Sequence, residues 1–369
     1  MSTSTDKIQI AIIIPGGIGT GKGNIGVPVM ERLVKLLAKD FEITVFSLFK
    51  INENYTPDGF TLIDCSAPIL LLRVIKFFSA FKQINRKTKF HLVHGFWALP
   101  SGLLAAGTGK IFKMKSVISV LGGDAISLPE INYGQLRHWL SRKLVLWCLR
   151  DTDEVICLTR YLLNNLESAG LMRRDVKIIP WGIDNSLFPF HDKPVLHPIK
   201  FLHIANLSPV KDQITLLKAF KIVADQVPSV LTIIGEGVSE LQIKALANDL
   251  NLTDKITFKG LIPYEVLPSH YQQADVLLHT SLSEGQSEVV TEAMSSGVVV
   301  CGTKVGLLYD QPTCCVSVPV KDYETLGGEI LKMLSETKRM NAIRQNAYAW
   351  SSSHSIHWTV DELSKIYKT

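Results

Sequence analysis

The sequence predicts an α/β protein of two doubly wound parallel sheets, and three observations lead to that prediction. The chain has 369 residues, which is enough for two domains at roughly 100–200 residues each. Apolar residues make up 46% and charged residues 20%, an ordinary globular composition that excludes disordered and collagen-like chains. Short β-branched runs alternate with longer segments of helical period over residues 8–179. The same alternation of strand and helix patterns begins again after a stretch that holds Pro189, Pro194 and Pro198.

Each predicted strand is a short apolar run followed by an amphipathic segment. In the first half the runs are Ile8–Ile14, Phe41–Phe46, Phe60–Ile63, Leu92–Val93, Ser116–Leu121, Glu154–Leu158 and Val176–Ile179. In the second half they are Phe201–Ile204, Val230–Ile234, Lys255–Phe258, Val276–Leu278, Val298–Cys301 and Cys315–Val318. Ligands of such sheets lie outside the carboxyl ends of the strands, which predicts a site in a central cleft between two domains.

The alternation also predicts where the domains begin and end. We expect one domain over residues 1–184 and a second over residues 185–352, joined by a proline-rich linker near residues 181–198. Residues 353–369 have a helical pattern that could pack back on either half, and we assign this C-terminal helix to the N-terminal domain.

The charge and cysteine patterns indicate which partners the protein can bind and which cell compartment it occupies. Lys and Arg total 39 against 34 Asp and Glu, a surplus too small to indicate nucleic acid. Residues 1–184 hold 23 cations against 15 acids, whereas residues 185–369 hold 16 against 19. The six cysteines show no zinc or redox spacing, which predicts no metal site and a reducing cytoplasm. Residues 1–7 are polar and residues 90–109 contain Pro100, so neither a signal peptide nor a membrane span is expected.

A glycine-rich loop between Pro15 and Gly26 follows the first predicted strand. It has the G-x-x-x-x-G-K spacing of a triphosphate-binding loop through Lys22, but Gly23 stands where Ser or Thr must hold Mg²⁺. As a dinucleotide-binding motif it starts too far from its strand, and no acidic residue ends the next one. We interpret it as a glycine loop that faces a phosphate or sugar, with Gly17 as a candidate contact. An NTPase, a nicotinamide enzyme and a loop without a ligand remain alternatives.

The most informative stretch is a predicted strand, turn, helix and strand over residues 279–303. Glu284 lies in the turn, where the carboxyl end of the strand would meet the cleft. Backbone N–H groups of residues 285–287 would open the helix toward an anion such as a diphosphate. Glu292 follows two turns later, about 80° round a helix from Glu284. Glu288, one turn before Glu292, is interpreted as a solvated side chain.

These segments form an ordered set that carries a family resemblance. The set comprises Pro180-Trp-Gly-Ile-Asp184, Ala205-Asn-Leu-Ser-Pro-Val-Lys211-Asp, Ile234-Gly-Glu-Gly237, Phe258-Lys-Gly260, Ala274-Asp-Val-Leu-Leu-His-Thr-Ser281 and Glu284-x7-Glu292-Ala-Met-x-x-Gly297. Weaker matches to the same pattern occur at residues 94–102 and in Leu121-Gly-Gly-Asp124. The set resembles the retaining GT-B glycosyltransferases of family four, also called glycosyl transferases group 1. The resemblance covers essentially the whole second half of the chain.

The resemblance implies a GT-B fold, in which two Rossmann-like domains face a central cleft. It also implies transfer of a sugar, with retention of configuration, from a nucleotide-sugar to a glycan or lipid-linked acceptor in cell-surface polysaccharide or glycolipid synthesis. By family frequency a UDP-sugar is favoured over GDP-mannose. No cofactor or metal ion is expected, because members of the family act without a metal ion and the sequence has no Asp-x-Asp motif.

The resemblance also implies roles for individual residues. Glu284 would contact the donor sugar, Glu292 the ribose hydroxyls and Lys211 the diphosphate, while the backbone near Leu261 would contact the base. The remaining donor contacts are assigned to Gly17, Asn206, Gly235, Gly237, Gly285, Gln286 and Ser287. The catalytic candidates are Glu284, Lys211, Asp124 and His94, and for the last two a purely structural hydrogen bond is an equal alternative.

Two departures from the family pattern keep other function classes open. Asn206 stands where the family usually has Arg, which leaves Lys211 to carry more of the diphosphate charge, helped by the loop of Lys22 or by Lys304. Leu121 stands where many members have His. These departures are the only support for one alternative, a non-catalytic, membrane-associated scaffold. A GT-B sugar-nucleotide epimerase, which would convert the donor without an acceptor, is the other alternative to a transferase.

Two basic, apolar segments of the first half predict peripheral contact with an anionic membrane. Residues 68–89 hold six cations and no acid among many apolar residues, and residues 137–150 repeat the pattern around Trp139 and Trp147. Such contact would place a cytoplasmic protein at the inner face of the membrane, near a lipid-linked acceptor. The alternative is that both segments are ordinary helices that cover a sheet.

Overall fold

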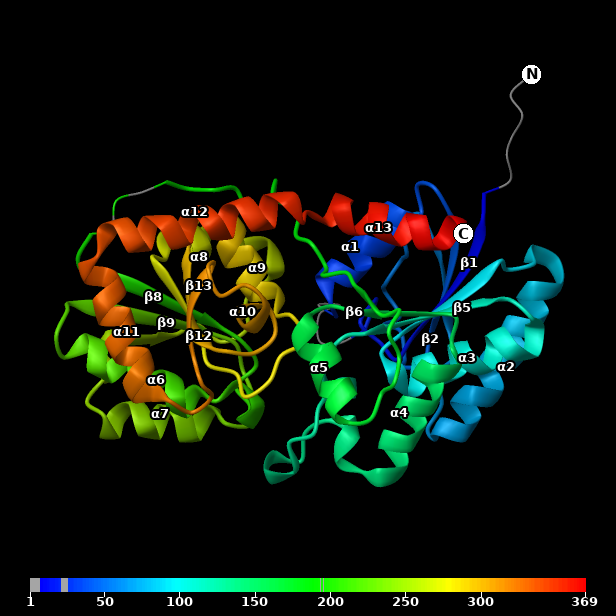
Figure 1. The fold of residues 1–369 in the computed structure, drawn as a ribbon, viewed down its shortest axis with the longest axis horizontal. Helices are drawn as coiled ribbons and strands as arrows, with labels where there is room; N and C mark the ends of the chain where they lie inside the picture. Colours follow the sequence, from blue (N-terminus) through cyan, green and yellow to red (C-terminus); the bar gives the residue numbers. More distant parts are fainter. Residues whose placement is uncertain (1–6, 21–25, 193, 195) are drawn as a thin grey trace, which may run out of the picture. The chain divides into compact units, whose positions relative to one another are not determined.

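The computed structural model describes residues 7–20, 26–192, 194 and 196–369. The chain divides into two compact units, one of Met1–Pro180 with His357–Thr369 and the other of Trp181–Ile356. Each unit is a parallel sheet with helices on both faces (Figure 1). The predicted fold class is therefore confirmed for each half of the chain.

The first unit holds a seven-stranded sheet in the order β3-β2-β1-β4-β5-β6-β7. Its strands are β1 (Gln9–Ile14), β2 (Glu42–Ser47), β3 (Thr61–Asp64), β4 (Leu92–Phe96), β5 (Lys115–Val120), β6 (Glu154–Cys157) and β7 (Lys177–Ile178). All neighbours are parallel, with Ile12 of β1 aligned with Val45 of β2 and with His94 of β4. All seven apolar runs predicted in the first half are strands.

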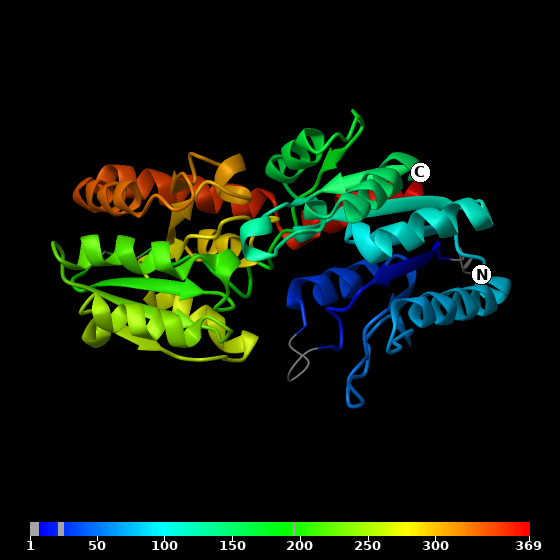
Figure 2. The same cartoon turned by 90° about the horizontal axis from the view of Figure 1, so that it is seen from below.

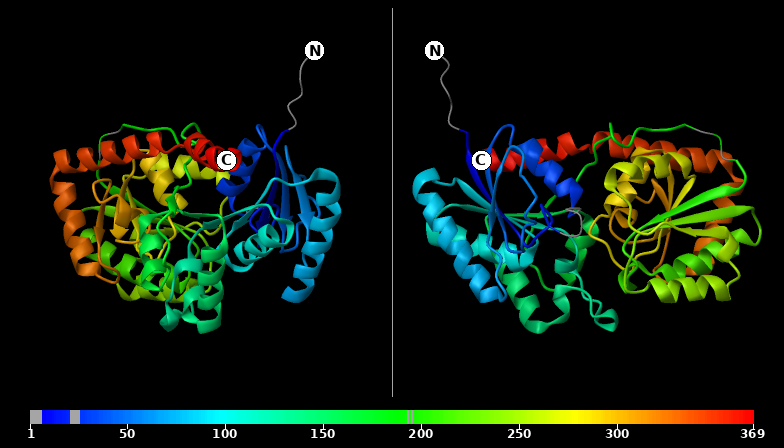
Figure 3. Two further views of the ribbon diagram at one scale, coloured as in Figure 1. Left: turned by 45° about the vertical axis from the view of Figure 1, so that its right-hand side comes forward. Right: turned by 180° about the vertical axis from the view of Figure 1, so that it is seen from behind.

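Helices cover both faces of this sheet (Figure 3). They are α1 (Pro28–Leu37), α2 (Leu70–Thr88), α3 (Leu103–Phe112), α4 (Trp139–Asp151), α5 (Arg160–Ser168) and the C-terminal α13 (Ile356–Lys368). The α2 side chains Phe77 and Phe81 are fully buried in a cluster with Phe46 of β2. Helix α13 packs on the same unit, where the Tyr367 ring meets Phe41 edge to face at 5.4 Å.

The second unit holds a six-stranded parallel sheet in the order β10-β9-β8-β11-β12-β13. Its strands are β8 (Ile199–Ile204), β9 (Ser229–Ile234), β10 (Ile256–Phe258), β11 (Val276–His279), β12 (Val299–Thr303) and β13 (Cys315–Val318). The strand order reverses between β8 and β11, which pair through Val276 and Phe201. Ligands of doubly wound sheets bind at such a switch point.

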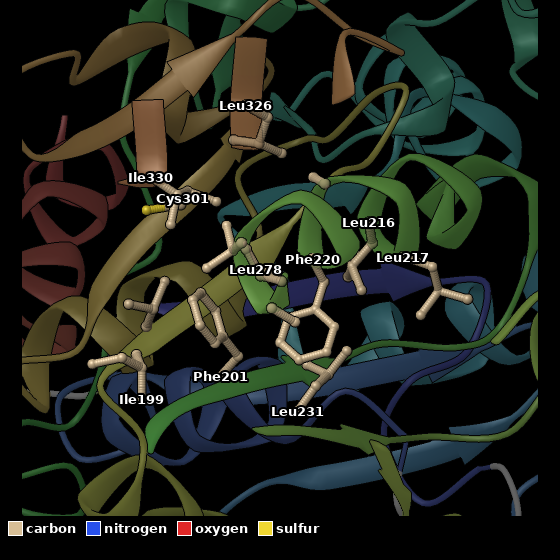
Figure 4. Close-up of a cluster of buried hydrophobic side chains, with 14 of the residues drawn as sticks. Ile199, Phe201, Leu216, Leu217, Phe220, Leu231, Leu278, Cys301, Leu326 and Ile330 are labelled. Carbon is tan, nitrogen blue, oxygen red and sulfur yellow. The ribbon is translucent and has the colours of Figure 1, made fainter. Parts of the chain in front are cut away.

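Seven helices of the described residues sandwich this second sheet (Figure 2). They are α6 (Gln213–Ala224), α7 (Glu240–Asp249), α8 (Leu267–Gln273), α9 (Glu288–Ser295), α10 (Leu307–Asp310), α11 (Tyr323–Ser335) and α12 (Thr337–Ser353). Figure 4 shows one face of the core, where the Phe201 and Phe220 rings meet edge to face at 5.4 Å. The other face packs α8, α9 and α10 against the sheet through Tyr271, Val290 and Leu307.

Loops from the carboxyl ends of β8 and β11 are tied together at the switch point. The Leu282 N–H donates to the Val210 carbonyl at 2.8 Å. The Thr280 hydroxyl donates to the carbonyls of Lys211 and Asp212 at 3.2 and 3.0 Å. These bonds fix two loops that are about 70 residues apart in sequence against one another.

The two basic segments that predicted membrane contact form helices α2 and α4. Helix α2 covers the sheet along only part of its length. Phe77 and Phe81 belong to the core, so the second half of α2 is an ordinary covering helix. Its first turns expose Leu70, Leu71 and Ile75 by more than half. No helix within the described ranges is long and apolar enough to cross a membrane.

Candidate active site

The switch point of the second sheet brings Lys211 and Glu284 into direct contact. Lys211 closes the loop after β8, and Glu284 lies in the loop after β11. The Lys211 Nζ lies 2.5 Å from Glu284 Oε1. The Ser281 hydroxyl donates to that same oxygen at 2.6 Å, and His279 Nε2 lies 3.2 Å from it. One carboxylate oxygen thus lies close to three groups, from the loop after β8, the loop after β11 and the end of β11 itself.

The charge of Lys211 is the largest of the effects that keep Glu284 ionised. Burial raises the pKa of Glu284, but the neighbouring ammonium and His279 outweigh burial and hold that pKa well below its usual range. The carboxylate is therefore ionised at physiological pH. The Glu284 side chain is 11% exposed and that of Lys211 24%, so neither is fully buried in the unliganded chain.

Gly306 lets Glu284 occupy this place. Its φ of +52° is a conformation that L side chains rarely adopt, and an added Cβ would lie 2.8 Å from the Glu284 Cβ. The same Cβ would lie 3.1 Å from the Gln286 carbonyl oxygen. Any larger residue at 306 would push the carboxylate away from Lys211.

Helix α9 starts at Glu288, later than the sequence indicates. Glu284 is therefore in a loop, and the predicted 80° relation between it and Glu292 is wrong, because the two do not share a helix. Ser287 precedes the helix with φ 79° and ψ 104°, a strained backbone for a residue other than glycine. The N–H groups of Gln286, Ser287 and Glu288 donate to no group in the described part of the chain. Free N–H groups at a helix start bind anions.

The Gln286 side chain forms two hydrogen bonds with the backbone of Trp181. Its Oε1 accepts from the Trp181 N–H at 2.8 Å, and its Nε2 donates to the Trp181 carbonyl at 2.6 Å. The side chain is thereby committed to the start of the second unit. The backbone N–H of Gln286 is the part of this residue that can meet an anionic ligand.

Glu292 is buried beneath the loops. Its residue is 1% exposed, and its Oε2 accepts from the Tyr271 hydroxyl at 2.6 Å. Burial raises the pKa of Glu292 to about 7, although the hydroxyls of Tyr271 and Tyr264 oppose the rise.

Glu288 differs from its prediction. The side chain is partly buried rather than solvated. Burial and then the negative charge of Glu292 raise the pKa of Glu288 to about 8. The prediction was wrong because sequence spacing does not show that Glu288 is partly buried near two other acidic side chains, Glu284 and Glu292.

The remaining predicted donor contacts surround the same edge of the sheet. Asn206, Gly237 and Leu261 are exposed in the loops after β8, β9 and β10. Gly235 has φ +131°, and a Cβ there would lie 1.9 Å from the Ala205 carbonyl oxygen. Only glycine permits this close approach of two loops. Lys304, predicted as a helper of Lys211, instead lies over the Tyr309 ring at 5.8 Å.

The candidates of the first unit lie in its interior. His94 is fully buried, with Nδ1 2.6 Å from the Tyr367 hydroxyl and Nε2 2.8 Å from Ser119 Oγ. Burial lowers the pKa of His94 to about 3, so the ring is neutral. Asp124 accepts N–H groups of Ala98 at 2.9 Å and of Gly122 at 2.8 Å. Asp124 therefore holds the backbone of two loops, and His94 holds helix α13.

The glycine loop is described only in part. Gly17 accepts from the Val27 N–H at 2.7 Å and donates to Thr20 Oγ1 at 2.8 Å. Gly21, Lys22 and Gly23, which carried the phosphate-loop interpretation, lie outside the described residues.

Sequence reasoning missed four residues of the site. Ser281 and His279 lie inside the recognised motif but were not assigned roles. Gly306 and Tyr271 lie outside it, and only the folded chain shows that they touch Glu284 and Glu292. No three His, Cys, Asp or Glu side chains of the described ranges gather in a way that could hold a metal ion.

Two family models match the chain in succession. The model described as "Glycosyltransferase Family 4" matches residues 27–187, and "Glycosyl transferases group 1" matches residues 189–350. The N-acetyl-alpha-D-glucosaminyl L-malate synthase of Bacillus anthracis is 22% identical over 81% of this chain and 80% of that protein. The mannosylfructose-phosphate synthase of Agrobacterium fabrum is 30% identical over 49% of this chain. The match spans 43% of that relative's length.

Solved structures share the fold over nearly the whole chain. The sucrose-phosphate synthase of Thermosynechococcus elongatus superposes with a TM-score of 0.82 at 19% identity, covering 98% of both chains. Anabaena Alr3699/HepE in complex with UDP-glucose superposes with a TM-score of 0.77 at 16% identity. The superposition covers 98% of this chain and 99% of the other.

Proposed function

Because the chain belongs to the glycosyltransferases of family four, glycosyl transferases group 1, we propose that it transfers a sugar from a nucleotide-sugar to an acceptor in cell-surface polysaccharide or glycolipid synthesis. The observation that carries the proposal is the 2.5 Å pair of Lys211 and Glu284, followed in the chain by three backbone N–H groups, at residues 286–288, that have no partner in the described ranges. Those groups present positive charge and hydrogen-bond donors to a diphosphate, and a carboxylate to sugar hydroxyls.

The leaving group explains why this combination suits sugar transfer. A departing nucleoside diphosphate gains negative charge as its bond to the sugar breaks, and preorganised donors lower that barrier. Lys211 and the N–H groups of residues 286–288 supply such donors at one place. We therefore propose that the reaction needs no metal ion.

The environment of Glu284 favours a role in binding over one as a nucleophile. Its Oε1 already meets Lys211 and Ser281, and its depressed pKa makes it a weak base. A front-face route, in which a donor phosphate oxygen takes the acceptor proton, needs no enzymic nucleophile. We propose retention of configuration by that route, with Glu284 accepting hydrogen bonds from the sugar.

A UDP-sugar is the proposed donor. Anabaena HepE, which has the same fold, is solved with UDP-glucose. GDP-mannose is the alternative, and one experiment separates them. Thermal unfolding is followed with UDP, GDP, ADP, CMP, NAD and ATP, with and without EDTA. A ligand at 100 times its Kd adds about 2.7 kcal/mol.

EDTA-insensitive stabilisation by UDP supports the proposal, and stabilisation by GDP reassigns the donor base. Stabilisation by NAD, or by ATP only without EDTA, would move the function to the glycine loop and contradict the proposal. No shift with any nucleotide would favour a scaffold. Product analysis without an acceptor tests the epimerase alternative, which converts the donor sugar by itself.

We propose a lipid-linked acceptor at an anionic membrane because the first unit exposes apolar side chains beside cations. Leu71 is 65% exposed in the first turns of α2, near Arg73 and Lys76. Trp139 of α4 is 70% exposed, with the Lys143 ammonium 4.8 Å from its ring centre. Apolar and aromatic side chains with adjacent Lys or Arg bind anionic interfaces.

Vesicle sedimentation tests this contact. The Leu71→Ser, Trp139→Ser double variant is expected to lose most of its binding to vesicles that contain anionic lipid. The control is Val238→Ser, Leu241→Ser, which removes two exposed apolar side chains of the second unit. Equal binding by both variants, or no binding by the wild type, would contradict the membrane proposal.

A further inference from the structure

We propose that Tyr271 is a positioning residue of the donor site, whose hydroxyl holds Glu292 as an oriented carboxylate for the donor's ribose. The proposal rests on the proposed function, because it takes Glu292 as the ribose contact. It adds a residue outside the motifs that the sequence offers.

The position of the Tyr271 hydroxyl is fixed by its surroundings. Tyr271 is fully buried in α8, and its ring meets Phe188 edge to face at 5.6 Å. Phe188 in turn meets Tyr264 at 5.8 Å. The hydroxyl lies 2.6 Å from Glu292 Oε2 and 3.3 Å from the Val289 carbonyl oxygen. A rigid aromatic cluster therefore presents one donor to one carboxylate.

The hydrogen bond from Tyr271 favours the ionised form of Glu292 and also orients its carboxylate. A hydroxyl that donates to a carboxylate stabilises the ionised form. The tyrosine is a donor throughout the neutral range, because burial and the nearby Glu292 raise its own pKa well above 10. Ribose hydroxyls donate to an ionised carboxylate, so a protonated Glu292 would lose part of its acceptor capacity.

Several other groups influence the protonation of Glu292. Tyr264 donates from the segment before α8, and Glu288 lies one turn earlier in α9. Glu288 in turn interacts with Lys211 and Glu284 across the loops. The acids titrate as a coupled set, so variants are needed to separate them.

Donor binding across pH provides the test. Calorimetry with UDP-glucose from pH 6 to 9 is expected to show affinity rising through about pH 7 in the wild type, as Glu292 ionises. Tyr271→Phe removes one stabilising bond, so that rise is expected to move up by about one pH unit. Affinity should then fall about fivefold at pH 6.5 and hardly at pH 8.5. In a background of Glu292→Gln, Tyr271→Phe should leave the profile unchanged.

Tyr367→Phe is the matched control, because Tyr367 is a buried tyrosine with a 2.6 Å bond in the first unit. It should lower stability without moving the profile of UDP-glucose binding. A Tyr271→Phe profile that coincides with the wild type would overturn this inference and leave the proposed function standing. A wild type that binds neither UDP-glucose nor UDP at any pH would overturn both.

Stability of the unliganded chain gives a second readout. Tyr271→Phe should cost more unfolding free energy at pH 8.5 than at pH 5.5, since the lost bond stabilises the ionised carboxyl. A cost that is equal at both pH values would contradict the inference even if the variant folds poorly.

Discussion

The two sheets have the same doubly wound plan but use their polar residues differently. In the second unit, Lys211 and Glu284 meet with the lysine side chain 24% exposed, and the N–H groups of residues 286–288 have no partner among the residues that the structure describes. In the first unit, His94 is sealed between Tyr367 and Ser119, and Asp124 is occupied by backbone N–H groups. Polar residues at a carboxyl edge are therefore not equivalent, because their partners decide whether they serve a ligand or the fold.

Glu284→Ala should show the largest effect in this comparison. Turnover is expected to fall about 10³-fold, the scale of losing one preorganised group that acts in the transition state. UDP affinity should change much less, whereas Lys211→Ala should lower both because the lysine binds the diphosphate. Steady-state kinetics with UDP calorimetry distinguishes the two. Equal losses of affinity and turnover in Glu284→Ala would refute its assigned role.

His94→Ala probes the sheet of the first unit. It removes two buried hydrogen bonds and leaves a cavity, which should cost about 2–4 kcal/mol of unfolding free energy. UDP affinity should stay within twofold, since the nucleotide is proposed to bind the second unit. Denaturant unfolding and calorimetry measure both quantities. A large loss of affinity without a loss of stability would reverse the assignment of His94 to the fold.

Gly306→Ala asks whether the geometry of Glu284 depends on its neighbour. The new Cβ would sit 2.8 Å from the Glu284 Cβ at a φ of +52°, a strain of about 1–3 kcal/mol. Turnover should fall about tenfold as the carboxylate shifts from Lys211. Gly328→Ala, which meets open space within a helix, is the control and should leave both stability and turnover nearly unchanged.

Glu288→Gln should have the smallest effect, and only at alkaline pH. The carboxyl has a pKa of about 8, so it is largely neutral at pH 7 and negative at pH 9. Its charge would then repel a diphosphate bound at the start of α9. Donor affinity at pH 9 should be about fivefold higher in Glu288→Gln than in the wild type, with little difference at pH 7. An equal gain at both pH values would show that charge is not the cause.

The sequence by itself determined the two sheets and much of the site. Strands were predictable because β-branched runs of the right length alternate with helical period, a local signal that each parallel strand carries alone. The Glu284-x7-Glu292 motif and Lys211 were recognisable because their residue types and order suffice to carry the resemblance.

Only the tertiary structure decided which polar groups meet. Lys211 reaches Glu284 because β8 and β11 are neighbours in the sheet, a pairing between residues more than 70 positions apart. Tyr271 and Gly306 likewise enter the site through contacts with residues that are more than 20 positions away in the sequence. Burial likewise made Glu288 a perturbed acid and His94 a neutral internal ring. Solvation and long-range proximity are properties of the packed chain, so a local pattern cannot encode them.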